Sequence, residues 1–162
     1  MRILGIIPAR FASTRFPGKP LADIGGKSMI RRVYEQCIKA KTLTKVIVAT
    51  DDERIAAHVR EFGEVIMTAA DHPSGTDRCH EVLGRIGEKF DYVINIQGDE
   101  PFIDPSQIEL VSHLLDGKTE LATLAKIIEE EEQVHNPNVV KAVTDKGGFA
   151  LYFSRNPIPY QR

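Results

Sequence analysis

The chain alternates between short apolar runs and longer stretches in which apolar residues recur at helical spacing. Four runs in its first two-thirds predict buried strands, at residues 2–7, 45–50, 64–68 and 92–96. The stretches that follow them predict four helices, at residues 28–40, 52–61, 76–86 and 105–115. This order is typical of a parallel sheet with helices on both faces. We therefore expect a Rossmann-like α/β fold.

Three local details refine this prediction. In the third helix, Val82, Leu83 and Ile86 are expected to form the face toward the core. Asp104 stands just before the Pro105 that begins the fourth helix, so we expect Asp104 to be its N-cap. Either Asp51 or Asp52 is expected to cap the second helix.

The last third of the chain follows a different pattern. Apolar runs at residues 121–128, 139–143 and 149–153 predict strands with few helices between them, so the sheet is expected to be mixed but mostly parallel. The whole of residues 1–162 is predicted to form a single nucleotide-binding domain. Because the chain stops in a Pro-rich segment directly after a predicted strand, we expect it to be a fragment that lacks a C-terminal part.

Bulk properties exclude several classes of protein. A formal net charge of −2 argues against a general binder of nucleic acid or acidic membranes, so any anion site must be local. No apolar run approaches the ~20 residues needed to span a bilayer. The two cysteines, Cys37 and Cys79, form no CxxC pair and predict neither a disulfide framework nor a zinc site. These features favour a cytoplasmic protein without a membrane partner.

A cationic loop follows the first predicted strand. Arg10, Arg15 and Lys19 lie within ten residues, among small and turn-forming residues. Guanidinium groups offer planar pairs of donors to phosphate oxygens, and a lysine adds a compact charge. A solvated basic loop is the alternative. Because open α/β sheets bind ligands at the carboxyl ends of their strands, the position of this loop favours a polyanion site.

A candidate metal ligand follows the fourth predicted strand, in the segment Gln97-Gly98-Asp99-Glu100-Pro101. Magnesium takes few protein oxygens when substrate phosphates supply the others, so one carboxylate there suffices. Asp99 or Glu100 could instead cap the next helix, but Asp104 is better placed for that role. We therefore predict that Asp99 contacts a metal ion.

The segment at residues 71–78, DHPSGTDR, has two interpretations. Ser74, Thr76 and Asp77 are typical helix-capping residues. The same geometry exposes backbone N–H groups and hydroxyls at a helix N-terminus, where a nucleotide can bind. His72 is expected to be structural, since neither Cys79 nor another histidine stands at metal-ligand spacing from it.

Other catalytic motifs are missing from the sequence. No GxGxxG follows the first strand, and no GxSxG or HExxH occurs. Gly25-Gly26-Lys27-Ser28 is similar to the end of a Walker A loop, but Leu21 stands where that motif needs glycine, and no strand directly precedes it. A cationic loop, a metal-type aspartate and a nucleotide-sized crevice together favour phosphoryl or nucleotidyl transfer.

Three segments carry a family resemblance: IIPARFASTRFPGKPL at residues 6–21, DHPSGTDR at 71–78 and VINIQGDEPFI at 93–103. In this order and spacing they resemble the sugar nucleotidyltransferases that use CTP, and among them the 3-deoxy-manno-octulosonate (Kdo) cytidylyltransferases, or CMP-Kdo synthetases. VATDD at residues 48–52 and SRNPIPY at 154–160 are similar too, so the resemblance covers essentially the whole chain.

The resemblance implies a role for each motif. Arg10 and Lys19 would hold the CTP triphosphate, with Arg15 nearby, and together with Asp99 they would be the catalytic residues. Asp99 would bind Mg²⁺, and Gln97 would face the sugar. Cytosine and ribose would be bound by the backbone around Pro8 and Ala9 and by the loop from Ser74 to Arg78, which comprises Ser74, Gly75, Thr76, Asp77 and Arg78.

The implied reaction joins CTP and Kdo into CMP-Kdo and pyrophosphate, for lipopolysaccharide synthesis. Family members continue beyond the point where this chain stops, and that continuation carries a second metal carboxylate, much of the sugar pocket and much of the dimer contact. A full-length protein would therefore be an active homodimer, whereas this chain alone would catalyse poorly. The alternatives are a CMP-sialic acid synthetase and a CTP-binding fragment with impaired catalysis.

Overall fold

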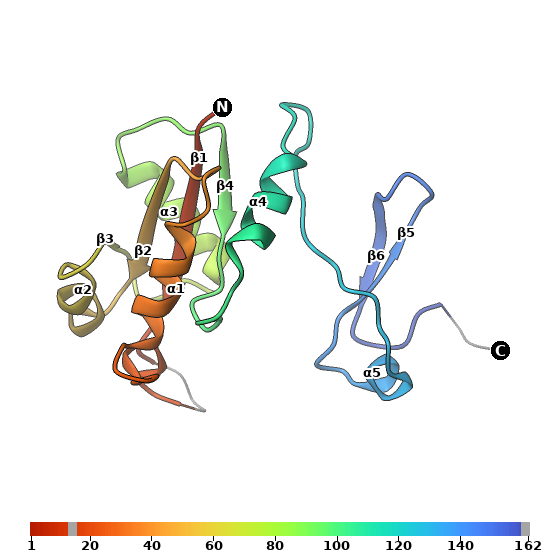
Figure 1. The fold of residues 1–162 in the computed structure, drawn as a ribbon, viewed down its shortest axis with the longest axis horizontal. Helices are drawn as coiled ribbons and strands as arrows, with labels where there is room; N and C mark the ends of the chain where they lie inside the picture. Colours follow the sequence, from red (N-terminus) through yellow and green to blue (C-terminus); the bar gives the residue numbers. More distant parts are fainter. Residues whose placement is uncertain (13–15, 160–162) are drawn as a thin grey trace. The chain divides into compact units, whose positions relative to one another are not determined.

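The computed structural model of the chain describes residues 1–12 and 16–159. Contacts divide the chain into two compact units, Met1–Ala122 and Thr123–Arg162. The first unit contains a sheet with helices packed on it, and the second contains a short helix and a hairpin (Figure 1). The single domain expected over residues 1–162 stays a prediction, and the candidate site described below lies wholly in the first unit.

A four-stranded parallel sheet forms the centre of the first unit. Its strand order is β3-β2-β1-β4, which places the first strand of the chain in the interior of the sheet. The strands are β1 (Ile3–Ala9), β2 (Lys45–Thr50), β3 (Glu64–Met67) and β4 (Tyr92–Asn95). The predicted α/β class with a mostly parallel sheet is confirmed.

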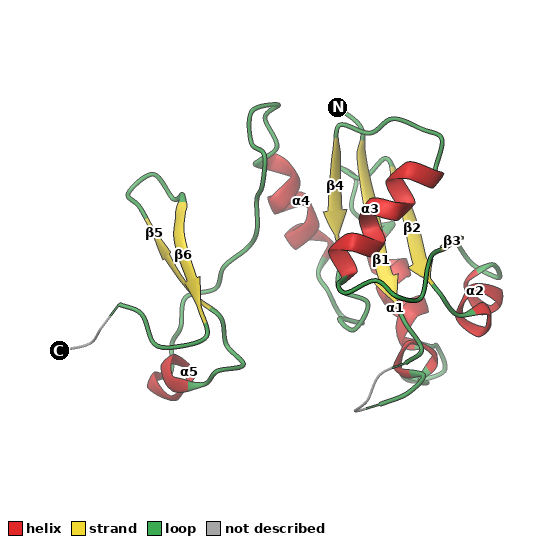
Figure 2. Cartoon of the chain, turned by 180° about the vertical axis from the view of Figure 1, so that it is seen from behind, coloured by secondary structure: helices red, strands yellow, loops and turns green. Residues whose placement is uncertain are grey.

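Helices cover both faces of this sheet (Figure 2). On one face, α1 (Met29–Cys37), α2 (Glu53–Val59) and α4 (Pro105–His113) supply apolar side chains, and on the other face α3 (Gly75–Arg85) does so. A one-turn 3₁₀ helix, η1 (Lys19–Leu21), stands between β1 and α1. The predicted arrangement of helices on both faces therefore agrees with the packing.

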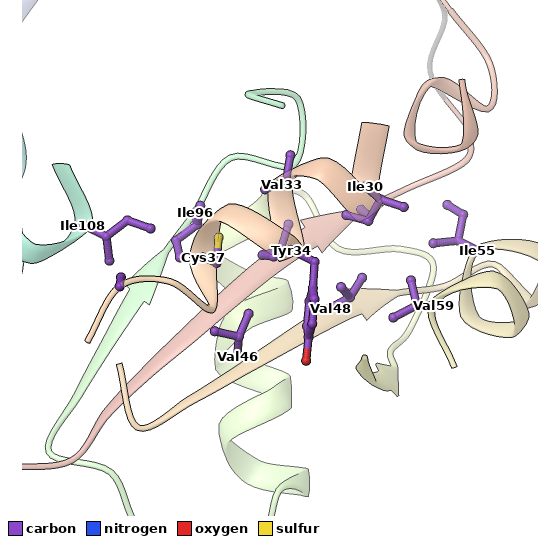
Figure 3. Packing of buried hydrophobic residues seen from close by; sticks show 13 residues of the cluster. Ile30, Val33, Tyr34, Cys37, Val46, Val48, Ile55, Val59, Ile96 and Ile108 are labelled. Carbon is purple, nitrogen blue, oxygen red and sulfur yellow. The ribbon is translucent and has the colours of Figure 1, made fainter. Parts of the chain in front are cut away.

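Alternation along the strands divides the core between the two faces. In β1, Ile7 packs on the side of α1, while Leu4 and Ile6 pack on the side of α3, as the two-residue period of a strand requires. Figure 3 shows the larger cluster, in which Val46 and Val48 of β2 meet α1. Burial of these side chains supplies the main driving force for folding this unit.

Each of the four longer helices begins at a side-chain N-cap. Asp52 accepts a hydrogen bond from the backbone N–H of Arg54 at 2.9 Å, and Asp104 accepts one from Ser106 at 2.9 Å. Ser28 and Ser74 cap α1 and α3 in the same way. The expected caps at Asp104 and at Asp52 are therefore confirmed, and capping fixes where these helices start.

Strand β1 ends two residues later than predicted, at Ala9, and begins one residue later, at Ile3. Pro8 and Ala9 continue the pairing with β2, opposite Ala49 and Thr50. Residues two apart in a strand direct their backbone groups to the same edge, and β4 ends opposite Ile6. The backbone nitrogen of Pro8, which carries no hydrogen, therefore points to the edge beyond the end of β4. No strand needs a hydrogen-bond donor there, so proline is tolerated.

Two predictions about apolar residues are wrong. Leu83 does not belong to the core face of α3, since it is 37% exposed, whereas Cys79 and Val82 are buried. Cys79, Val82 and the partly buried Ile86 form the face that packs on the sheet, and Leu83, about 100° beyond Val82, stands at the edge of that face. No strand forms at residues 121–128, where Leu121 is 91% exposed.

The second unit contains α5 (Glu131–His135) and an antiparallel hairpin of β5 (Lys141–Thr144) and β6 (Ala150–Ser154). Its two strands form a sheet of their own. Lys141 is only 3% exposed, and its ammonium group donates to the carbonyl oxygens of Asn136, Val139 and Arg155. Three carbonyls therefore satisfy a buried cation in this unit.

Helices in the described part of the chain are too short, or too polar, to cross a membrane.

Candidate nucleotide-binding site

A cavity of about 650 Å³ lies at the carboxyl end of β1 and β4. It is formed by the loops that follow these two strands, by η1 and by the start of α3. Its volume is within the range of pockets that bind small molecules. The residues that line it are Pro8, Ala9, Arg10, Phe16, Lys19, Pro20, Met29, His72, Ser74, Gly75, Arg78, Gln97, Gly98 and Asp99.

Most of the residues predicted for the site meet in this cavity, although they come from three distant segments. Those that line it are Pro8, Ala9, Arg10, Lys19, Ser74, Gly75, Arg78, Gln97 and Asp99. Thr76 and Asp77 belong to α3 and are not among the lining residues. Arg15 lies outside the described residues. The roles of these residues in binding stay predictions.

Five lining residues were not predicted for the site: Phe16, Pro20, Met29, His72 and Gly98. Phe16 and Pro20 belong to the cationic loop, and Gly98 directly precedes Asp99, so adjacency to the motifs was the available signal. Met29 is the first residue of α1 and has no motif around it. His72 stands in the 71–78 segment, where it was interpreted as structural.

Lys19 and Asp99 form an ion pair at the wall of the cavity. The Nζ atom of Lys19 donates to Oδ2 of Asp99 at 2.7 Å, and the side chains are 36% and 54% exposed. Lys19 is the first residue of η1, and Asp99 follows β4. The predicted phosphate-binding cation and the predicted metal-binding carboxylate are therefore paired with each other.

The start of η1 depends on Gly18. This residue has φ of +70°, a left-handed conformation that favours glycine. Its N–H donates to the carbonyl of Phe11 at 2.9 Å, which closes the described ends of the cationic loop. The ring of Phe11 in turn lies 3.3 Å from the guanidinium carbon of Arg54, at the start of α2. These contacts fix the backbone that carries Lys19.

Close backbone packing positions the other side of the pair. A Cβ atom added to Gly98 would lie 2.7 Å from the carbonyl oxygen of Pro8. The loop after β4 thus runs directly against the end of β1, and only a residue without a side chain permits this approach. Asp99 is held next to the cavity as a consequence.

Arg78 is a buried cation in the cavity wall. Its side chain is 5% exposed, and Nη2 lies 3.1 Å from Oδ1 of Asp51. Nη1 donates to the hydroxyl of Thr68. Arg78 therefore ties α3 to the residues that follow β2 and β3, and this contact, not helix capping, is the role of Asp51 in the structure. The neutralised guanidinium has less charge to offer a ligand than the sequence suggested.

Ser74 and Asp77 satisfy each other at the start of α3. The hydroxyl of Ser74 donates to the Asp77 carboxylate at 2.5 Å and accepts from the Asp77 backbone N–H at 3.2 Å. This is the capping interpretation of the 71–78 segment. The N-terminus of α3 still borders the cavity through Gly75, so a nucleotide can reach it.

His72 is hydrogen-bonded to Glu81 of α3. Glu81 also accepts from the N–H of Ala69 at 2.9 Å and forms an ion pair with Arg85. The hydrogen bond with His72, followed by that from Ala69, holds the pKa of Glu81 below its ordinary value of 4.5. The expected structural role of His72 agrees with these contacts, which anchor one wall of the cavity.

Residues 25–28, which are similar to the end of a Walker A loop, have a different geometry. They follow η1 and form a tight turn closed by a bridge between Asp23 and Ser28. The ammonium group of Lys27 pairs with Glu35 at 2.7 Å, and Ser28 caps α1. Residues 25–28 do not line the cavity at the carboxyl end of β1 and β4.

Across the described ranges, no group of three or more His, Cys, Asp or Glu side chains is placed to hold a metal ion. Asp99 is the one acidic residue among those that line the cavity. A hard divalent cation there would need oxygens from a bound phosphate in addition to this carboxylate.

Comparison with known proteins decides the family. The cytidylyltransferase family model matches residues 4–162. The chain belongs to the cytidylyltransferase family. Two curated proteins, from Cytophaga hutchinsonii and Bacteroides thetaiotaomicron, are named 3-deoxy-manno-octulosonate cytidylyltransferase. The first is 54% identical over 99% of this chain, and the second is 56% identical over 100% of it. The chain spans only 64% and 66% of their lengths.

A solved structure supports the same assignment. CMP:2-keto-3-deoxy-manno-octonic acid synthetase complexed with CTP superposes with a TM-score of 0.89 at 41% identity. The match covers 100% of this chain and 67% of that protein. The resemblance drawn from the three motifs is therefore confirmed at the level of the cytidylyltransferase family and its fold.

Proposed function

We propose that this chain is the nucleotide-binding part of a CTP:3-deoxy-manno-octulosonate cytidylyltransferase. The observation that carries the proposal is the convergence of Arg10, Lys19 and Asp99 on one cavity at the carboxyl end of the sheet. Relatives with this name match the chain over nearly its whole length, and the similar solved structure is a complex with CTP. Neither comparison favours a CMP-sialic acid synthetase.

The proposed reaction transfers a cytidylyl group. The anomeric hydroxyl oxygen of Kdo attacks the α-phosphorus of CTP and forms an O–P bond, while its proton is lost to solvent. The bond from the α-phosphorus to the oxygen that bridges to the β-phosphate breaks, and this oxygen leaves with the pyrophosphate. Negative charge then accumulates on the departing pyrophosphate. Cations fixed beside the β- and γ-phosphates stabilise that charge, which is the main way in which enzymes accelerate phosphoryl transfer. Arg10 and Lys19, which both line the cavity, would take this role.

The two substrates would be aligned by different walls of the cavity. The backbone at Pro8 and Ala9 and the start of α3 at Ser74 and Gly75 would bind cytosine and ribose. Gln97, on the loop after β4, would face the sugar. Holding both reactants in line removes much of the entropic barrier.

The donor set of this site fits magnesium bound together with a nucleotide. Asp99 supplies a carboxylate at the cavity wall, and phosphate oxygens would supply further ligands. When bound there, Mg²⁺ would polarise the α-phosphoryl group.

The wider context completes the proposal. The product CMP-Kdo would serve lipopolysaccharide synthesis, and the full-length protein would act as a homodimer. A cytoplasmic location is supported by Cys37 and Cys79, both of which are buried free thiols, as is usual in a reducing compartment.

Pyrophosphate release from CTP, Kdo and Mg²⁺ tests the proposal. We expect release with Kdo and much less with N-acetylneuraminate, because a polar pocket discriminates strongly between acceptors that differ in polar groups. Asp99→Asn should reduce turnover by roughly 10²–10³-fold, while the matched variant Glu100→Gln should retain it. CTP binding without any pyrophosphate release would refute catalysis by this chain.

A further inference from the structure

The Lys19–Asp99 ion pair joins two segments that are fixed independently. Lys19 stands directly after Gly18, whose N–H is bonded to Phe11, and its own carbonyl accepts from Ala22 at 3.1 Å. Asp99 follows Gly98, which packs against the backbone of Pro8. Because both backbones are anchored, the 2.7 Å contact reflects how the fold places the two side chains.

The same two charges are the ones that the ligands require. A triphosphate would use the Lys19 ammonium, and a divalent cation would use the Asp99 carboxylate. In the structure each charge is neutralised by the other. A nucleotide that binds without metal must therefore compete with Asp99 for the Lys19 ammonium. A metal ion that binds without nucleotide must compete with Lys19 for the Asp99 carboxylate.

We infer that the Lys19–Asp99 pair is a latch that couples nucleotide binding to metal binding. The inference rests on the proposed function, because it assigns phosphate and metal to this cavity. When triphosphate takes Lys19, it releases Asp99 for the metal ion, and the metal ion releases Lys19 in the same way. Each ligand thus removes the competitor of the other, and the coupling is reciprocal.

The latch makes an unusual prediction for Asp99→Asn. Loss of a metal ligand should weaken binding of the metal–nucleotide complex, but loss of the competitor of Lys19 should strengthen binding of metal-free nucleotide. The side chains are 36% and 54% exposed, so the pair has the strength of a partly exposed ion pair. We expect the latch to change affinity by about two- to fivefold.

Calorimetric titration in EDTA measures this effect. CTP and, separately, inorganic tripolyphosphate are titrated into the wild-type chain, Asp99→Asn, Lys19→Met and the double variant. Asp99→Asn also removes a negative charge that repels the triphosphate, and that repulsion is present whether or not Lys19 is. The effect of the latch is the additional increase in ligand affinity that Asp99→Asn gives when Lys19 is present. The double-mutant cycle isolates this increase.

We expect Asp99→Asn to increase the affinity for metal-free CTP and tripolyphosphate, and this increase should be about two- to fivefold larger with Lys19 present than in the Lys19→Met background. Glu100→Gln, which removes a neighbouring charge outside the pair, should give equal gains in both backgrounds. Equal gains from Asp99→Asn in both backgrounds would overturn the latch. Both side chains are partly exposed, so thermal unfolding should show that all variants keep the fold.

The two ligands separate this inference from the proposed function. Binding of CTP with no coupling in the cycle refutes the latch and leaves the proposed function intact. Coupling with tripolyphosphate but no binding of CTP supports the latch and refutes the proposed function. Failure of both ligands to bind refutes both, because the cavity is then not an anion site.

Discussion

Gly98→Ala tests whether the contact between the β4 loop and β1 builds the candidate site. The added Cβ would lie 2.7 Å from the carbonyl oxygen of Pro8 and 3.5 Å from the side chain of Ile7. The first of these contacts is with backbone, so no side-chain rotation can relieve it. The loop must therefore move away from the end of β1.

The expected size of the effect follows from two opposing contributions. Overpacking of this kind costs about 1–3 kcal/mol. Gly98 has no positive φ, so alanine is allowed there, and the reduced entropy of the unfolded chain returns about 0.4–1 kcal/mol. We expect the free energy of unfolding to fall by about 1–2 kcal/mol. Because the same loop carries Asp99, nucleotide affinity should fall as well.

Gly84→Ala is the matched control. Gly84 lies inside α3, and a Cβ atom there would meet nothing within 4 Å. Alanine in a helix is favoured over glycine by about 0.5–1 kcal/mol, so this variant should be more stable than the wild type. Urea unfolding followed by far-UV circular dichroism measures both changes, and CTP calorimetry measures affinity. If Gly98→Ala equals the wild type in stability and in CTP affinity, the packing argument is wrong.

Three further predictions concern an ion pair, a hydrogen-bonded carboxylate and two thiols of the first unit. Arg78→Met should lower the free energy of unfolding by about 3–5 kcal/mol, because it leaves the Asp51 carboxylate unpaired. Adding Asp51→Asn should restore part of this loss, and urea titrations measure both changes. Since the pKa of Glu81 is below 4.5 in the folded chain, its contribution to stability is complete above that pH and is lost as the pH falls through the folded-state pKa. Glu81→Gln should therefore flatten the acid limb of a stability–pH profile, and an unchanged limb would contradict this. Burial raises the pKa of Cys37 to about 12 and that of Cys79 to about 11. A disulfide reagent at pH 8 should therefore label these thiols only when the chain unfolds. Rapid labelling of the folded chain would contradict their burial.

Much of the fold could be predicted because local pattern and tertiary contact agree in the first unit. Strand β2 was predicted with its observed bounds, since its apolar run is buried on both sides. The caps at Asp52 and Asp104 were visible because capping depends on residues next to the helix. Residues 121–128 were mispredicted because an apolar run shows that burial is possible but does not supply a partner strand.

The site was predictable as a set of residues but not as a set of contacts. Motifs at the ends of strands indicated which residues meet, because parallel strands end at one edge of a sheet. The pairing of Lys19 with Asp99, across 80 positions, follows from backbone packing that no motif records. In the same way, the burial of Arg78 against Asp51 depends on where α3 crosses the sheet.

The central place of β1 has a consequence for synthesis of the chain. Strand β1 is made before its two partners, β2 and β4, which follow only at residues 45–50 and 92–95. At about 5–20 residues per second, roughly 4–17 s pass between β1 and β4 on the ribosome. During that time the edge of β1 that pairs with β4 lacks its strand partner, although α1, α2 and α3 have already been made. Folding of this unit should therefore be slow, and chaperones that shield nascent chains should raise its yield.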